Sequence, residues 1–198
     1  MARREVNDVA TLRAMSDPLR LAILRVLMFD ADVDPRIMSA KEIAAELGEP
    51  QTKLYRHLKQ LEEAKLIEVA ETRVVSGIIE QRYRTAQIDL RLSPALINDT
   101  GARDELMTTV GAVIDEYRQE LRRNLRVNRV DMRPSSDPNS VGFVLQVGYA
   151  RRMNVERARE FRDRLIALID EFEAVKEDPG GTDVHLLIGW YGETDPTP

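Results

Sequence analysis

Apolar side chains recur every three to four positions over residues 9–29, a spacing typical of an amphipathic helix. The run is interrupted at Ser16-Asp17-Pro18. Proline disfavours helical geometry at the residue before it and suits the first turn of a new helix. The pattern therefore predicts two helices, one ending near Met15 and one starting at Asp17, in place of a single long one.

Two short helices are predicted next, joined by a tight turn. Ser39 and Glu42 have the spacing of a capping box, which opens a helix, and Gly48 would end it. Pro50 suits the first turn of a following helix that runs to about Ala64. The apolar face of this second helix consists of leucines at helical spacing, Leu54, Leu58 and Leu61. Two short helices around a glycine-containing turn are the signature of a helix-turn-helix.

A β-hairpin is predicted directly after the helix pair. A strand begins at residues 66–69, Ser76-Gly77 supplies a turn, and residues 78–85 return. Residues 88–92 alternate between apolar and polar positions and add a further strand. Because a hairpin in this place is the wing of a winged helix-turn-helix, we predict such a DNA-binding domain over residues 1–92.

The remaining residues, 93–198, have a different pattern. It predicts a long helix at Arg103–Arg126, then a strand at Val141–Tyr149, a helix over residues 154–177 and a strand at Val184–Tyr191. The last helix is long enough to join two parallel strands. The fold class is therefore predicted as α+β, with a winged helix-turn-helix followed by a helix and a β-α-β region.

The first helix of this second region carries one apolar stripe, Leu106, Val110, Val113, Tyr117, Leu121 and Leu125. Such a stripe packs in the core of its own chain or forms the seam of a dimer, and we favour a partial role in a dimer. An isolated pair of strands is only marginally stable, so the two predicted strands need partners from the wing sheet or from a second subunit. Residues 93–198 are thus expected to dimerise, with a possible site for a small-molecule effector.

Charge is unevenly distributed. The chain of 198 residues has a net charge of −5, yet residues 1–92 sum to zero, and residues 93–198 carry the whole excess of acid. Within the first part, the segment 51–61 contains three cations and no acid, and the segment 72–84 has three arginines against Glu80. Local charge matters more for phosphate contact than the total, so a nucleic-acid partner stays open.

Cysteine is absent, which excludes disulfides and thiolate metal sites. No apolar run approaches the roughly 20 residues that cross a bilayer, and the N-terminus lacks the apolar core of a signal peptide. These features predict a cytoplasmic protein with no membrane partner.

Four segments together resemble the ArsR-like winged-helix regulators. They are Leu12–Leu24, Glu42–Gly48, Gln51–Leu61 and Glu63–Ile67, and the resemblance covers about residues 9–86. It implies a homodimer on double-stranded DNA, often a repressor released by a small effector.

The resemblance also implies which elements meet DNA and which site is missing. The helix from Gln51 would enter the major groove, and the hairpin at residues 72–85 would contact the backbone or the minor groove. Metal-sensing members carry cysteines near the positions of Ser39 and Lys41 here. The thiolate site is therefore absent, and we expect no metal and no cofactor.

The residues predicted to contact DNA are polar or charged and lie on these two elements: Gln51, Thr52, Lys53, Tyr55, Arg56, His57 and Lys59 on the helix, and Arg73, Arg82 and Arg84 on the hairpin. The helix cations stand three residues apart on one face, suited to phosphates or guanine. A solvated polar face is the competing interpretation. For His57 a packing role is equally open, and the hairpin arginines can be the charged edge of a strand.

Other functions find less support in the sequence. Phe143, Tyr149, Trp190 and Tyr191 can line an effector pocket, although aromatic residues on strands are more often core. A metal site shared by the two histidines would need chance proximity. No nucleophile motif, glycine-rich phosphate loop or Ser-His pairing is present, so no enzyme is predicted.

Two alternatives remain beside DNA binding. A winged helix can serve as a protein-interaction module, which the acidic balance of the chain allows, although the basic face of residues 51–61 argues against it. The region after Ser93 can instead bind a ligand or carry catalysis, which a pocket with convergent polar groups would support.

Overall fold

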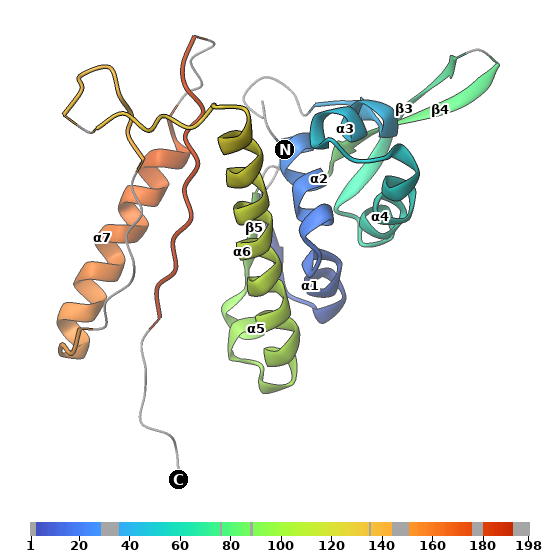
Figure 1. Cartoon of the computed structure of the whole chain (residues 1–198). Coiled ribbons are helices and arrows are strands. Elements are labelled where there is room, and N and C mark those ends of the chain that lie inside the picture. The colour runs from blue at the N-terminus through green and yellow to red at the C-terminus, as the bar shows by residue number, and fades with distance from the viewer. Residues whose placement is uncertain are drawn as a thin grey trace. The chain divides into compact units, whose positions relative to one another are not determined.

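The computed structural model describes residues 3–28, 36–75, 77–87, 89–134, 136–143, 151–175 and 180–191. Contacts group the chain into two compact units, residues 1–129 and 130–198 (Figure 1). The first unit is larger than the winged helix alone because a long helix packs on it. The division of function predicted at residue 92 remains a prediction.

The predicted break in the first helix is confirmed. Helix α1 spans Val9–Met15 and α2 spans Pro18–Met28. Asp8 caps α1 by accepting a hydrogen bond of 2.7 Å from the backbone N–H of Thr11. Asp17 accepts bonds of 3.0 Å from the next two free N–H groups of α2, those of Leu19 and Arg20. Each helix therefore has its own N-terminal cap, which is why the chain can turn sharply between them.

The helix pair is also confirmed, with α3 at Ala40–Leu47 and α4 at Gln51–Glu63. Ser39 and Glu42 form the predicted capping box, and Gly48 ends α3 in the left-handed region at a φ of 66°. Pro50 stands one residue earlier than expected, at the N-cap of α4. The three leucines of α4 are at most 1% exposed and lie in the core between α2, α3 and the wing.

The wing is an antiparallel hairpin of β3, Ile67–Val75, and β4, Ile78–Thr85. A two-residue strand, β2 at Met38–Ser39, pairs with β4, which gives the strand order β2-β4-β3. The hairpin extends beyond the helices at one end of the first unit (Figure 1).

The strand predicted after the wing is present as β5, Asp89–Leu92, and its partner is a strand that the sequence pattern did not indicate. This partner, β1 at Arg3–Val6, runs parallel to β5. The two strands bring the start of the chain to the end of the winged helix. Two short helical segments follow, α5 at Pro94–Asn98 and a 3-10 turn at Thr100–Ala102.

Helix α6 spans Arg103–Arg126, as predicted, and lies along α1 and α2 (Figure 1). Its buried residues are the small Thr109 and Ala112, and Ala102, the residue before the helix, is buried as well. Leu106 is the member of the predicted stripe that packs against the core.

The second unit contributes one helix among its described residues, α7 at Val155–Glu173, within the range predicted for it. Residues 184–191 form no strand in this structure. Their expected partner, Val141–Tyr149, lies mostly outside the described residues, and a strand has no ladder of hydrogen bonds without a partner. None of the helices described has the length and apolar character that a membrane crossing requires.

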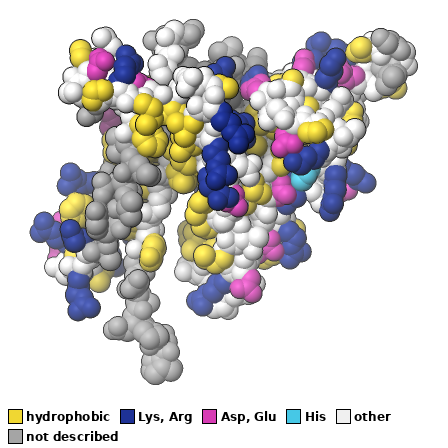
Figure 2. All heavy atoms as spheres, viewed as in Figure 1, with side chains coloured by type: hydrophobic (Ala, Val, Ile, Leu, Met, Phe, Trp, Pro, Cys, Tyr) yellow, Lys and Arg dark blue, Asp and Glu magenta, His cyan; other side chains and the backbone are white. Residues whose placement is uncertain are grey.

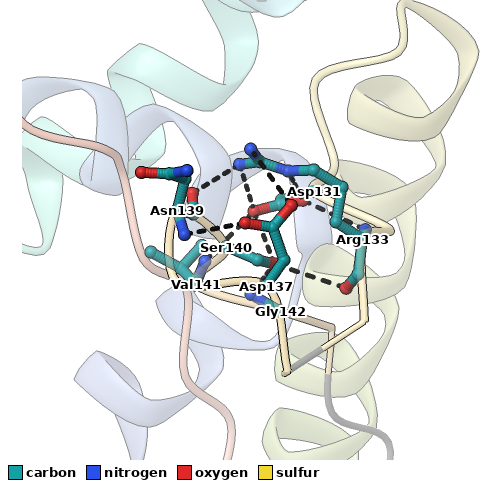
Figure 3. Close-up of polar contacts among 7 residues, drawn as sticks. All are labelled: Asp131, Arg133, Asp137, Asn139, Ser140, Val141 and Gly142. Carbon is teal, nitrogen blue, oxygen red and sulfur yellow. Dashed lines mark hydrogen bonds and ion pairs between the residues drawn. The ribbon is translucent and has the colours of Figure 1, made fainter.

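A closed loop precedes α7 (Figure 3). Asp131 accepts bonds of 2.8 and 2.9 Å from the Arg133 guanidinium and 2.9 Å from the Ser140 hydroxyl. These contacts, the arginine first, hold the pKa of Asp131 well below its usual range. Arg133 also donates to the carbonyl of Asn139 at 2.7 Å. The Asp131 carboxylate is therefore already engaged in hydrogen bonds with residues of its own loop.

Candidate nucleic-acid interface

The orientation of α4 is fixed by its leucines. Because these are buried on one side, the opposite side faces solvent and carries Thr52, Lys53, Tyr55, Arg56 and Lys59. The helix begins at Pro50 without a side-chain cap and with no acidic residue in its first turn. Its first N–H groups and the positive end of its dipole are thus available to a phosphate.

The cations of this face differ in their partners. Lys53 Nζ lies 3.0 Å from Glu49 Oε2, and Lys59 Nζ lies 3.8 Å from Glu63 Oε1, both exposed pairs. Arg56 forms no ion pair or hydrogen bond with any residue that the structure describes. Exposed pairs of this kind contribute about 0–1 kcal/mol, so phosphate can replace the carboxylates at little cost.

The two uncharged candidates at the start of α4 contact each other. Gln51 Nε2 donates a hydrogen bond of 2.6 Å to the hydroxyl of Tyr55, whose side chain is 53% exposed. The pair presents an amide oxygen and an aromatic edge at the helix start, where residues of a recognition helix reach base edges.

His57 points toward the start of α2. Its Nδ1 lies 3.5 Å from Asp17 Oδ1, and its side chain is 17% exposed. Burial lowers the pKa of His57, an effect that the Asp17 carboxylate partly opposes. A neutral, half-buried imidazole fits the packing interpretation better than a phosphate contact. Nearby, Arg20 donates to Gln60 Oε1 at 3.0 Å and ties the same two helices together.

The wing arginines are held to different degrees. Arg82 is 14% exposed and lies 3.1 Å from Glu42 and 3.0 Å from Glu71, so it joins the wing to α3. Arg84 pairs with Glu68 and Arg73 with Glu71, and both arginines are more exposed, at 41% and 55%. Arg73, nearest the tip, is therefore the least constrained of the three arginines.

The tip of the wing is apolar. Val74, Val75 and Ile79 are 75%, 51% and 72% exposed. An open cleft of about 520 Å³ lies between this hairpin and the start of α4, and its walls include Tyr55, Val75 and Tyr83. Burial raises the pKa of Tyr83, which stays a neutral donor.

The other candidate residues are not brought together. Phe143, Trp190 and Tyr191 are 38%, 48% and 83% exposed, and Tyr149 lies outside the described residues. In the described part of the chain, no group of three or more His, Asp or Glu side chains has the arrangement to hold a metal ion.

One residue that positions α4 was missed by the sequence analysis. Arg4 of β1 donates to the carbonyls of Lys65 and Ala64 at 2.5 and 3.2 Å, and to the hydroxyl of Thr11 at 3.3 Å. A cation at the C-terminal end of a helix satisfies free carbonyls and complements its dipole. Nothing in the local pattern predicts this, because the two partners are about 60 residues apart.

Surface charge around these elements is mixed, with cations interspersed with acids (Figure 2). A protein-family model described as a helix-turn-helix domain matches residues 15–70, from the end of α1 to the first half of β3. No curated protein matches the chain. The chain thus contains a helix-turn-helix domain, the kind of domain that DNA-binding transcription regulators carry.

Proposed function

We propose that this protein is a sequence-specific regulator of transcription that inserts α4 into the major groove of DNA. The observation that carries the proposal is the outer face of α4, on which Arg56 stands without a partner among the described residues, between two weakly paired lysines. The leucines behind it fix which side chains face outward. A helix held in this way has the size and orientation that the groove admits.

The side chains have distinct parts in this proposal. Arg56 reads a guanine edge or grips a phosphate, while Lys53 and Lys59 exchange their carboxylates for phosphates. Gln51 and Thr52 lie at the helix start and reach bases. On the wing, Arg73 meets the backbone, and Arg84 joins it if the Glu68 pair opens. Arg82 and His57 support the elements from inside.

We further propose a homodimeric repressor of the ArsR-like type without the cysteine metal site, acting in the cytoplasm. Two copies related by a two-fold axis would meet half-sites about 34 Å apart. Residues 93–198 would supply the pairing surface and, if the regulator responds to a small molecule, its site. No catalytic step is part of the proposal.

The test is fluorescence anisotropy with the DNA upstream of the protein's own gene and with scrambled DNA, over a salt series. We expect preferential binding that falls steeply with salt, because phosphate contacts release counterions. Arg56→Ala should cost about 1–3 kcal/mol of binding free energy. Arg159→Ala, which removes an equal charge from α7 in the second unit, is the matched control and should change little.

One observation favours a second candidate, a protein-interaction module. The apolar side chains at the wing tip, Val74, Val75 and Ile79, suit a protein surface better than a phosphate backbone. Under that alternative, no DNA would bind even at low salt. The proposal that α4 reads the DNA sequence would also be contradicted if all DNA sequences bound with the same affinity and Arg56→Ala left that affinity unchanged.

A further inference from the structure

One ring nitrogen of His57 lies inside the protein without a partner. Its Nδ1 atom is buried and has no hydrogen-bond partner in the part of the chain that the structure describes. Asp17 Oδ1 lies 3.5 Å away, beyond the roughly 2.7–3.2 Å of an ordinary N–H···O hydrogen bond. The same oxygen accepts hydrogen bonds from the backbone N–H groups of Leu19 and Arg20, which hold it in place. The imidazole thus faces a fixed carboxylate that it does not bind.

The charges around His57 are unequal. Burial is the largest cause of the lowered pKa of this side chain. The Asp17 carboxylate opposes burial, while three cations, Arg20 of α2 and Lys53 and Arg56 of α4, act in the same direction as burial. Unperturbed histidine already has a pKa of about 6.5. The imidazole of the free protein is therefore neutral at pH 7.

Binding of DNA would reverse this balance. Lys53 and Arg56 lie on the outer face of α4 that is proposed to meet phosphates. Once phosphates neutralise these two cations, the cations no longer repel a proton on His57. The phosphates also add negative charge, which acts over roughly 8–10 Å in physiological salt. Removal of water would act in the opposite direction, but the His57 side chain is only 17% exposed before DNA arrives, so this effect is small.

We propose that the protein takes up one proton from solvent at His57 when α4 binds DNA, so that its affinity for DNA rises as the pH falls from about 8 to about 6. The inference rests on the proposed function, because DNA must meet the outer face of α4. A protonated imidazole donates from both ring nitrogens. Nδ1 then donates to Asp17, the residue that caps α2. The proton thus replaces a buried nitrogen without a partner by an ion pair between α4 and the start of α2.

The direction of the pH dependence follows from linkage. A group whose pKa is higher in the complex favours the complex below that pKa, and the gain is lost as the pH rises through it. A rise of one unit corresponds to about tenfold in affinity. Fluorescence anisotropy at constant ionic strength, with the DNA upstream of the protein's own gene, should give a dissociation constant at pH 8 at least about threefold above that at pH 6.

Three variants assign the effect to its source. His57→Gln takes up no proton, so it should bind DNA with similar affinity at both pH values. The matched control is His185→Gln, which removes the other of the chain's two histidines and should keep the pH dependence of the wild type. Asp17→Asn keeps an oxygen that can cap α2 but lacks the charge, and should weaken the dependence. Circular dichroism checks the folding of each variant. An equal pH dependence in the wild type and His57→Gln, or none in the wild type, would overturn the inference.

Proton NMR of the histidine Cε1–H signals measures the pKa of His57 directly, and His57→Gln assigns its signal. The pKa should be higher in the complex than in the free protein. Without DNA, Arg56→Ala should raise it, because one of the repelling cations is gone. Lys59→Ala removes an equal charge from the same helix and should not raise it. If DNA binds and the pKa of His57 does not rise, the inference alone is wrong. If no DNA binds at any pH, the proposed function fails and the inference fails with it.

Discussion

Arg25 offers a direct test of how α6 is attached to the winged helix. Its guanidinium bridges Glu116 and Glu120, and the three side chains are 31%, 13% and 12% exposed. Replacing Arg25 by alanine leaves two nearly buried carboxylates four residues apart, where like charges repel. Breaking a buried pair costs about 3–5 kcal/mol and losing an exposed one about 0–1. Because a third of the arginine is in solvent, we expect a loss of about 2 kcal/mol.

Equilibrium urea unfolding followed by circular dichroism at 222 nm measures this loss. Circular dichroism reports on the helices directly, whereas Trp190, the single tryptophan, lies in the second unit. Protein concentration must be held constant, because dimerisation adds to apparent stability. Arg126→Ala on the same helix, without a partner among the described residues, is the control and should cost under about 0.5 kcal/mol.

A second substitution separates repulsion from simple loss of packing. In the Arg25→Ala background, Glu116→Gln should recover part of the stability, because it removes one of the two neighbouring charges. In wild type the same change should destabilise. Equal effects of Glu116→Gln in both backgrounds, or a loss below about 0.5 kcal/mol for Arg25→Ala, would refute the coupling argued from these distances.

Three further predictions concern the winged helix. Leu58 is 1% exposed, so Leu58→Ala leaves a cavity in the core and should lower the free energy of unfolding by about 2–5 kcal/mol, measured with urea. A smaller loss would mean that the core collapses into the cavity. Gly48→Ala should lower the free energy of unfolding by about 1 kcal/mol in the same assay, because a residue with a Cβ is strained at a φ of 66°. A gain in stability would contradict this. The backbone N–H of Ser39, aided by Arg82, lowers the pKa of Glu42. The ionised Glu42 therefore contributes its full stabilisation of the fold above the unfolded pKa of about 4.3, and this stabilisation is lost as the pH falls below that value. Thermal melts from pH 7 to pH 3 should therefore show a decline that Glu42→Gln reduces, and identical slopes would exclude this carboxylate as the cause.

The winged helix was predictable because its signals are local. The capping box at Ser39, the glycine that ends α3 and the leucines of α4 each act within a few residues, and each appears where the pattern placed it. The break at Pro18 is of the same kind. Such elements follow from backbone geometry and from the helical spacing of apolar residues, both of which can be inferred from a single sequence.

The contacts that assemble the domain were not predictable in this way. Strand β1 has four residues and no alternation, and it is defined only by its partner β5, more than 80 positions later. Arg82 lies on the wing and its contact with DNA stays a prediction, but nothing in the local pattern indicated that it pairs with Glu42 and Glu71. The sign of a side chain's charge can be read from the sequence, but the residue that it pairs with depends on the tertiary structure.

The break between α1 and α2 connects the two surfaces that the proposals concern. Ser16 contacts Thr109 and Glu105 of α6, while the next residue, Asp17, caps α2 and lies 3.5 Å from His57 of α4. Two adjacent residues therefore touch both α6, whose apolar stripe is predicted to take part in a dimer, and α4, the helix proposed to read DNA. In a dimer formed through α6, the separation of the two recognition helices depends on how rigidly this corner holds. A capped break supported from both sides is a stiff link, and a stiff link is what a fixed half-site spacing of about 34 Å requires.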